Sequence, residues 1–401
     1  MDKKNKNPNV PNLRFPNFCT PWKIIPISNL LQFQNGINGS PEQYGKGVKF
    51  ISVGDILNNI YITYDNIKGL IDIDEKTLNN YSVTYGDILF QRSSEIINDI
   101  GRTNVYLDKN NIATFGGFVI RGKRIGQYNP VFFNYLLKSP SSRKSIIRLG
   151  AGAQHYNIGQ ENIKTLNFCF PDEIEQAKIA CLFSKIDERI QIQIKIISSI
   201  ESQIKSINNH VAFDSATNEL SIGNLFDIKT NSKILEKHDG KYCIVDMGTI
   251  DSNGNYITGK YTDDITSILT KGTLVMPKDD IGGGKIICKT LYINESNKYV
   301  LSDHVFALKL RNSKYNPLYF SSLINSQYHN HNLKRLVTGS AQLGINQENL
   351  NKYKLRFSDC LELQKKYSKL IQLINEKLFI EKKLLYDLYN QKNYLMKNMF
   401  I

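Results

Sequence analysis

The stretch AQHYNIGQENIKTLNFCFPDEIEQAKI, residues 153–179, decides the fold because the chain repeats it once. It returns as AQLGINQENLNKYKLRFSDCLELQKKY, residues 341–367, starting 188 residues later. Each copy leads into a long segment with the apolar period of a helix. An internal repeat of this kind predicts two similar halves related by a pseudo-twofold axis.

Composition limits the class of protein. The 401 residues are too many for one typical domain, and 41% hydrophobic residues are enough to build well-packed cores. The six cysteines show no CxxC pairing, which predicts reduced thiols. No apolar run reaches transmembrane length, and the N-terminus lacks a signal-peptide core. We therefore expect a cytoplasmic protein that has no contact with a membrane.

The excess positive charge is shared between the two halves. The formal net charge is +14, of which +5 belongs to residues 13–172 and +4 to residues 213–358. Charge spread in this way favours two domains that each face a polyanion. Together with the repeat, it suggests a protein that contacts two half-sites on DNA.

The pattern along the chain predicts five segments and an α+β fold. Residues 1–12 are polar and predict a disordered tail. Residues 13–172 and 213–358 contain short β-like runs between turns, with a few short helices, and predict two globular domains of mixed β-structure. Residues 173–212 and 359–401 each predict one long helix.

Both long helices keep a seven-residue apolar period in the same register, which indicates a coiled coil. We expect antiparallel packing, because it places one globular domain at each end of the helix pair. The alternative, an amphipathic helix on a domain surface, rarely keeps so narrow a stripe over several heptads. The predicted seam consists of Phe183, Ile186, Ile190, Ile197, Ile200 and Ile204 in the first helix, and Ile371, Ile374, Leu378, Leu385, Leu388 and Leu395 in the second.

Four stretches carry a resemblance to a known family. They are LRFPNF (residues 13–18) followed by Trp22, GDILFQRS (residues 86–93), PDEIEQAKI (residues 171–179) and DERI (residues 187–190). Their order resembles that of the specificity subunit of a Type I restriction-modification system. The resemblance covers nearly the whole chain.

The resemblance implies a function and partners. In that family, two target-recognition domains each read half of a split sequence in double-stranded DNA. The two helical regions set the spacing of the half-sites and dock two methyltransferase subunits, and restriction subunits join through the complex. The resemblance thus implies a subunit that does no catalysis itself and needs no cofactor.

Base-reading side chains are expected on loops that end strands or precede the repeated stretch, where Arg, Lys, Asn and Gln reach base edges. A solvated strand end is the alternative for the basic cluster at residues 121–124. The candidate DNA-contacting residues are Gln91, Arg92, Ser93, Arg121, Lys123, Arg124, Gln154, His155, Tyr156, Lys278, Lys285 and Gln342.

Three motifs resemble catalytic or ligand sites only in part. NPLY, residues 316–319, lacks the second proline of an amino-methyltransferase motif, and NPVF at residues 129–132 favours a helix cap at both places. GGGK, residues 282–285, fails the P-loop spacing and predicts a flexible turn near DNA or a simple hairpin turn. HNH, residues 329–331, has no further ligand at metal spacing, so we expect surface histidines and no metal site.

Two other functions are compatible with parts of the sequence. A catalytic fusion would carry a methyltransferase or nuclease in the same chain, and the missing motifs argue against it. A non-catalytic coiled-coil scaffold, or a general DNA-binding protein, would show no sequence preference on DNA. Mapping methylated genomic sites after co-expression with the cognate methyltransferase would separate these alternatives.

Overall fold

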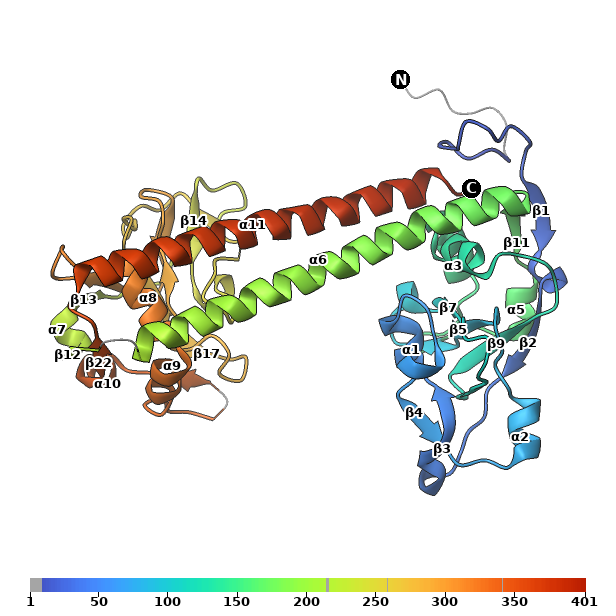
Figure 1. Cartoon of the computed structure of the whole chain (residues 1–401), viewed down its shortest axis with the longest axis horizontal. Helices are drawn as coiled ribbons and strands as arrows, with labels where there is room; N and C mark the ends of the chain where they lie inside the picture. Colours follow the sequence, from blue (N-terminus) through green and yellow to red (C-terminus); the bar gives the residue numbers. More distant parts are fainter. Residues whose placement is uncertain (1–8, 214–215, 258, 341) are drawn as a thin grey trace. The chain divides into compact units, whose positions relative to one another are not determined.

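The computed structural model describes residues 9–213, 216–257, 259–340 and 342–401 (Figure 1). The chain divides into two compact units, one formed by Met1–Gln193 with Leu384–Ile401 and the other by Ile194–Lys383. Two long helices, α6 (Glu173–Phe213) and α11 (Leu361–Asn398), contribute a segment to each unit. The predicted α+β fold class with two globular domains and two long helices is confirmed.

The globular part of the first unit contains one four-stranded sheet, one three-stranded sheet and two strand pairs. Their orders are β2-β9-β5-β7, β4-β3-β8, β1-β11 and β10-β6. The strands are β1 (Lys23–Pro26), β2 (Leu31–Asn35), β3 (Tyr44–Ile51), β4 (Gly69–Ile71), β5 (Ile88–Gln91), β6 (Ser93–Ser94), β7 (Thr103–Val105), β8 (Thr114–Phe115), β9 (Val119–Arg124), β10 (Tyr156–Asn157) and β11 (Asn167–Phe170). The helices are α1 (Val53–Asn58), α2 (Glu75–Asn80), α3 (Pro130–Lys138), α4 (Pro140–Ile147) and α5 (Gln160–Lys164).

The second unit repeats these sheets in the same order. Its orders are β13-β20-β16-β18, β15-β14-β19, β12-β22 and β17-β21. The strands are β12 (Asn218–Ser221), β13 (Phe226–Lys229), β14 (Tyr242–Val245), β15 (Tyr261–Thr262), β16 (Leu274–Pro277), β17 (Asp279–Asp280), β18 (Leu291–Tyr292), β19 (Tyr299–Leu301), β20 (Val305–Leu310), β21 (Leu343–Gly344) and β22 (Lys354–Phe357). The helices are α7 (Ile222–Leu225), α8 (Pro317–Asn325), α9 (Gln327–Lys334) and α10 (Gln347–Lys352).

A glutamine near the start of each long helix ties that helix to the globular part. Gln176 Oε1 accepts a hydrogen bond from the Asn129 amide at 2.9 Å, and its Nε2 donates to the Pro171 carbonyl at 3.0 Å. Gln364 makes the same two bonds, from the Asn316 amide at 2.9 Å and to the Ser358 carbonyl at 2.8 Å. Gln176 and Gln364 are both buried, and in each the amide oxygen and the amide nitrogen have a hydrogen-bond partner that offsets the cost of desolvation.

The cores explain why the units differ from the five predicted segments. The core of the first unit joins Phe132 and Phe133 of α3 to Ile190 of α6 and to Leu388 and Met399 at the end of the chain. The core of the second unit in the same way includes Val211 of α6, with Tyr367 of α11 packed against it. Because each globular part buries its apolar face against both helices, the helices are divided between the units and do not form separate domains.

Within each unit the two long helices run in opposite directions. In the first unit, Phe183 stacks near Phe400, and Asp187 forms an ion pair with Lys392. In the second unit, Glu201 forms an ion pair of 2.9 Å with Lys382. Every predicted seam residue is buried or half-buried. Lys392, which interrupts the apolar period of the seam, is accommodated by the Asp187 carboxylate.

Part of the predicted disordered tail is held to the first unit. Residues 1–8 lie outside the described residues. The Asn9 carbonyl accepts a hydrogen bond from the Trp22 amide at 2.9 Å, Pro11 is buried, and the Leu13 amide donates to the Asn398 carbonyl at 2.8 Å. The prediction of disorder is therefore wrong for residues 9–12, because backbone hydrogen bonds that composition does not reveal fix them. Arg14 adds two bonds of 2.7 Å to the buried Glu175 carboxylate.

Candidate nucleic-acid interface

Two of the predicted DNA-contacting segments of the first unit meet in one strand pair. β6 pairs antiparallel with β10, so that Ser93 lies opposite Asn157 and Ser94 opposite Tyr156. The Ser93 hydroxyl donates to Asn157 Oδ1, and the Arg92 carbonyl accepts from the Ile158 amide at 3.0 Å. The loop after β5 and the segment before α5, separated by about 60 residues of sequence, therefore form one continuous edge.

The second unit builds the same edge from the equivalent segments. β17 pairs antiparallel with β21, so that Asp280 lies opposite Leu343. The Lys278 carbonyl accepts from the Ile345 amide at 2.9 Å, as the Arg92 carbonyl does from Ile158 in the first unit. The structure thus pairs the segment that follows Lys278 with the segment that follows Gln342, as it pairs the segment that follows Arg92 with the one that contains Tyr156.

A third segment joins each edge, and sequence reasoning missed it. The Arg92 amide donates to the Phe118 carbonyl at 2.8 Å, and the Lys278 amide donates to the His304 carbonyl at 3.1 Å. Phe118 precedes β9 and is 68% exposed, so it adds an apolar group to the surface of this edge. The only sequence signal was the Gly-Gly-Phe triplet ahead of an apolar strand.

The two edges differ in charge. In the first unit the edge presents half-buried Arg92 and exposed Gln154 and His155. In the second unit His304 Nδ1 lies 3.0 Å from Asp279 Oδ2, and its Nε2 lies 3.7 Å from Asp303 Oδ2. Two equivalent surfaces with different side chains are suited to contact two different sequences.

Lys285 lies in a loop that a buried carboxylate holds. Asp280 accepts hydrogen bonds from the amides of Gly282, Ile286 and Ile287 at 2.5, 2.8 and 3.2 Å. The loop is therefore ordered by one side chain and is not a simple hairpin turn. Lys285 itself is exposed beside the β17–β21 edge, as is Gln342.

Arg121 and Gln91 are corrections to the predicted surface. Arg121 is 2% exposed, and its Nε donates to Asp87 Oδ2 at 2.9 Å. Burial raises the pKa of Asp87, and the Arg121 guanidinium and the amides of Arg124 and Thr84 oppose that shift. Gln91 is 5% exposed and donates to the Ser93 carbonyl at 2.9 Å. Gln91 supports the edge from inside, whereas Arg121 lies inside the four-stranded sheet, and neither buried side chain is presented to solvent.

Arg124 and Lys123 lie near the end of β9. The Arg124 guanidinium donates to the carbonyls of Gly126 and Tyr128 at 3.3 and 2.9 Å and stacks on the Tyr128 ring at 4.8 Å. Its positive charge is thus fixed against the domain by hydrogen bonds. Lys123 is exposed, and of the basic cluster it is the side chain whose amine can reach outward.

With this geometry in place, the similarity to known proteins can be stated. Residues 216–388 match the family model of the Type I restriction modification DNA specificity domain. The solved S subunit of a Type-I restriction-modification system from M. genitalium has a TM-score of 0.63 at 18% identity, over 98% of this chain and 99% of that one. A chain from a type I R-M system, solved to explain complex assembly and conformational transition, has a TM-score of 0.57 at 9% identity, over 94% and 96%.

The family model covers the second globular part, and the first part repeats all four of its sheet orders. The two solved structures show that the fold of the whole chain is the fold of their class. The second globular part therefore matches the Type I restriction modification DNA specificity domain, and the whole chain has the fold of the two solved subunits. The resemblance predicted from the sequence is confirmed, and so is the function of sequence-specific DNA recognition that it implies.

The partial catalytic motifs have structural roles in this chain. Asn316 Oδ1 accepts from the amides of Leu318 and Tyr319 and caps α8, as Asn129 caps α3. The predicted surface position is wrong for His329, because it is 1% exposed and its Nδ1 lies 2.9 Å from the Tyr353 hydroxyl. Burial lowers the pKa of His329 to about 4, which keeps it neutral. Within the described ranges, no three His, Cys, Asp or Glu side chains are grouped to hold a metal ion.

The long helices also present apolar side chains to solvent. In the second unit Leu373, Phe379 and Ile380 of α11 are 54%, 71% and 63% exposed. In the first unit Tyr386 and Tyr394 of the same helix are 66% and 63% exposed. Large apolar side chains in such a row mark a contact surface. None of the described helices is long and apolar enough to cross a membrane.

Proposed function

We propose that this specificity subunit reads a split DNA sequence, one half with the β6–β10 edge and the other with the β17–β21 edge, and does no chemistry itself. The observation that carries the proposal is the duplicated edge: the same three segments meet in each unit but present different side chains. A non-catalytic scaffold would have no reason to keep two exposed edges of this kind.

Site mapping with edge variants tests this proposal. The subunit is co-expressed with its methyltransferase partner, and methylated genomic sites are sequenced. His155→Ala changes an exposed side chain of the first edge, and Gln342→Ala changes one of the second. Each variant should relax one half of the recognised sequence by about 1–3 kcal/mol per lost base contact and leave the other half unchanged. Variants that weaken both halves equally would favour the general DNA-binding alternative.

We also propose that α6 and α11 dock two methyltransferase subunits, one for each repeat, and that restriction subunits join through that complex. The support is the row of exposed apolar side chains on α11 and the twofold repetition of the helices. Native mass spectrometry of the reconstituted complex should show two methyltransferase subunits per chain. Phe379→Ser should weaken the assembly, whereas Lys377→Ser, at an exposed polar position on the same helix, should not. Saturation at one subunit would contradict the proposal.

A further inference from the structure

A cavity of about 350 Å³ in the first unit is lined by three cationic side chains, Arg102, Lys138 and Arg143. Asn98 and Thr103 also line it, and none of the described residues that line it is an aspartate or glutamate. None of the β6–β10 edge residues named above lines the cavity, and neither the recognition of bases nor the docking of partners explains its charge.

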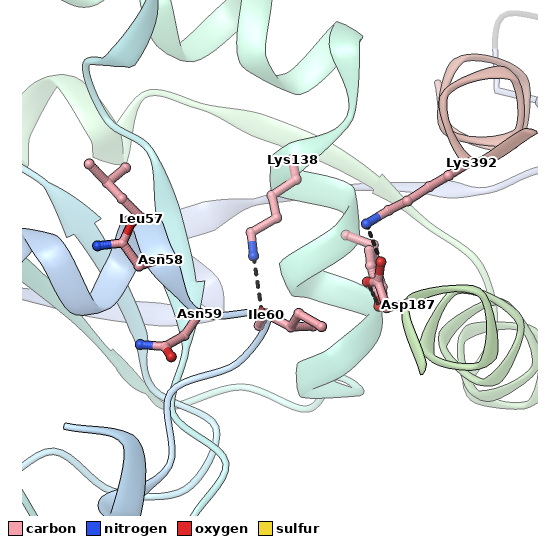
Figure 2. Close-up of a pocket in the computed structure, with 8 residues that line it drawn as sticks. Leu57, Asn58, Asn59, Ile60, Lys138, Asp187 and Lys392 are labelled. Carbon is pink, nitrogen blue, oxygen red and sulfur yellow. Dashed lines mark hydrogen bonds and ion pairs between the residues drawn. The ribbon is translucent and has the colours of Figure 1, made fainter. Parts of the chain in front are cut away.

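Lys138 lies at the end of α3, between this cavity and a neighbouring one of about 260 Å³ (Figure 2). Its Nζ donates one hydrogen bond, to the Ile60 carbonyl at 3.3 Å. The carboxylate nearest in the second cavity is Asp187, which already binds Lys392 and accepts from the Tyr135 hydroxyl at 2.6 Å. Lys138 thus faces the cavity without a carboxylate of its own.

The two arginines bring no free carboxylate to the cavity. Arg102 forms an ion pair of 2.6 Å with Asp99, which uses that carboxylate. Arg143 donates to the carbonyls of Gly101, Ile100 and Asn98 at 2.7, 2.6 and 3.1 Å, and among the described residues it has no ion pair. Burial is the main cause that lowers the pKa of Lys138 to about 7; Lys392 and Arg102 lower it further, and Asp187 opposes the shift. The cluster is short of negative charge, because two of its cations lack a carboxylate.

A buried hydroxyl also lacks a partner at this cavity. Thr103 is 3% exposed, and its Oγ1 has no hydrogen-bond partner among the described residues. An unsatisfied buried hydroxyl costs free energy, so its presence beside three cations indicates a missing acceptor.

The second unit shows that the fold does not require a cation at the positions of Lys138 and Arg143. The residue 187 positions after Lys138 is Asn325, which bonds the backbone of Thr290 through both its amide atoms. The residue 187 positions after Arg143 is Asn330, which donates to the Cys288 carbonyl at 2.9 Å. The residue 187 positions after Arg102 is Lys289, whose Nζ donates to the Asn325 carbonyl at 3.2 Å. Neutral amides therefore replace Lys138 and Arg143 in the repeat, while a cation is kept at the position of Arg102.

We propose that this cavity binds a phosphate group, with Lys138 and the two arginines supplying positive charge and the Thr103 hydroxyl donating a hydrogen bond. Its volume is at the lower end for small-molecule sites, which fits a compact phosphate-bearing group. Arginine and lysine together are the usual recognition set for phosphate oxygens. The phosphate group has two possible sources, a free small molecule or the DNA backbone.

Equilibrium dialysis of the full-length chain against radiolabelled inorganic phosphate tests the proposal without DNA or partner subunits. The wild-type chain should bind one phosphate with a dissociation constant on the order of 1 mM or below. Lys138→Met should weaken binding at least about tenfold, and Thr103→Val should weaken it by a smaller factor. Lys144→Met, an exposed lysine on α4 outside the cavity lining, is the matched control and should bind as wild type does. Lys138→Asn, which copies the repeat position, is a second variant should Lys138→Met fail to fold.

DNA binding identifies the source of the phosphate. If the DNA backbone supplies it, Lys138→Met should reduce the slope of log affinity against log salt by about 0.9, the value for one lost phosphate contact. If a free molecule supplies it, that slope should stay unchanged while dialysis still shows saturable binding. The proposal is overturned if folded Lys138→Met binds phosphate as wild type does. It is equally overturned if the wild-type chain binds no phosphate and the variant leaves the salt slope unchanged.

Discussion

At the scale of single residues, the Asp87–Arg121 pair shows how a charge inside the first unit is held. Asp87 is fully buried and accepts from the amides of Thr84 and Arg124 as well as from Arg121. Removing the guanidinium would leave a buried carboxylate without its counter-charge. We predict that Arg121→Met destabilises the first unit by about 3 kcal/mol or more, measured as a lower thermal midpoint.

The same variant separates a supporting role from base reading. The DNA sequence that is methylated with the folded fraction of Arg121→Met should match that of wild type, because the Arg121 side chain is buried and cannot reach DNA. Lys123→Met, two residues along β9 and exposed, is the control that should leave the thermal midpoint unchanged. An altered recognition sequence in Arg121→Met would show that Arg121 contacts bases after all.

Lys138 makes the stability of the first unit depend on pH. Its pKa falls from an ordinary value of 10.5 to about 7 in the folded chain, chiefly through burial. Between these two values the unfolded chain binds more protons than the folded chain, so stability rises with pH across this window. Below about pH 7 both states carry the charge, and the cost of burying it is constant.

We therefore predict that wild type gains thermal stability relative to Lys138→Met as pH rises from about 7 to about 10. Taking the difference between the two proteins removes the titration of the other groups. Melting curves in phosphate-free buffers across that range provide the measurement. A difference that is flat with pH would mean that Lys138 keeps its ordinary pKa.

At the scale of elements, the buried glutamines couple each long helix to a capped helix of the globular part. Gln176→Ala would leave the Asn129 amide and the Pro171 carbonyl without partners, and Gln364→Ala would do the same to Asn316 and Ser358. We predict a loss of about 1–3 kcal/mol in the affected unit. Hydrogen exchange should rise at α3 in the first variant and at α8 in the second.

A variant on the outer face of α6 provides the control for this experiment. Gln191→Ala changes an exposed glutamine on the same helix and should leave exchange at both capped helices unaltered. Equal exchange changes in both units for a single glutamine variant would contradict the local role that the hydrogen bonds imply.

The elements also show how far the sequence could predict the structure. The heptad pattern predicted both helices and their seam, because burial along a coiled coil repeats at a fixed interval. Ser93, Tyr156 and Gln342 were predicted from their place beside strands. The pairing of β6 with β10 and of β17 with β21 depends on tertiary contacts that no local pattern records. Phe118 carried no periodic signal at all. Arg121 was misplaced because a basic side chain is usually exposed, and its buried partner lies 34 residues away.

At the scale of the whole molecule, the long helices are proposed to set the distance between the half-sites. Inserting four residues into both α6 and α11 would lengthen each helix by ~6 Å. That distance corresponds to about two base pairs at ~3.4 Å each. We predict that an active variant methylates sites with the same two half-sequences and a longer spacer. Because four residues are not a whole heptad, the insertion also rotates one segment against the other and lowers activity.

A seven-residue insertion in both helices is the matched comparison, because it preserves the heptad register while lengthening the helices further. It should retain more activity than the four-residue insertion and give a still longer spacer. Active insertion variants that methylate the original sites would show that the helices do not fix the spacing.

The strand pairs that form the two edges also affect how such a gene can recombine. β6 and β10 lie on either side of α3 and α4 in the sequence, so an exchange of DNA between them joins strands that were never selected to pair. A crossover within the codons of α6 keeps both strands of each edge together. Such a crossover would give a chain with a new combination of two intact edges, each with both of its strands from one parent.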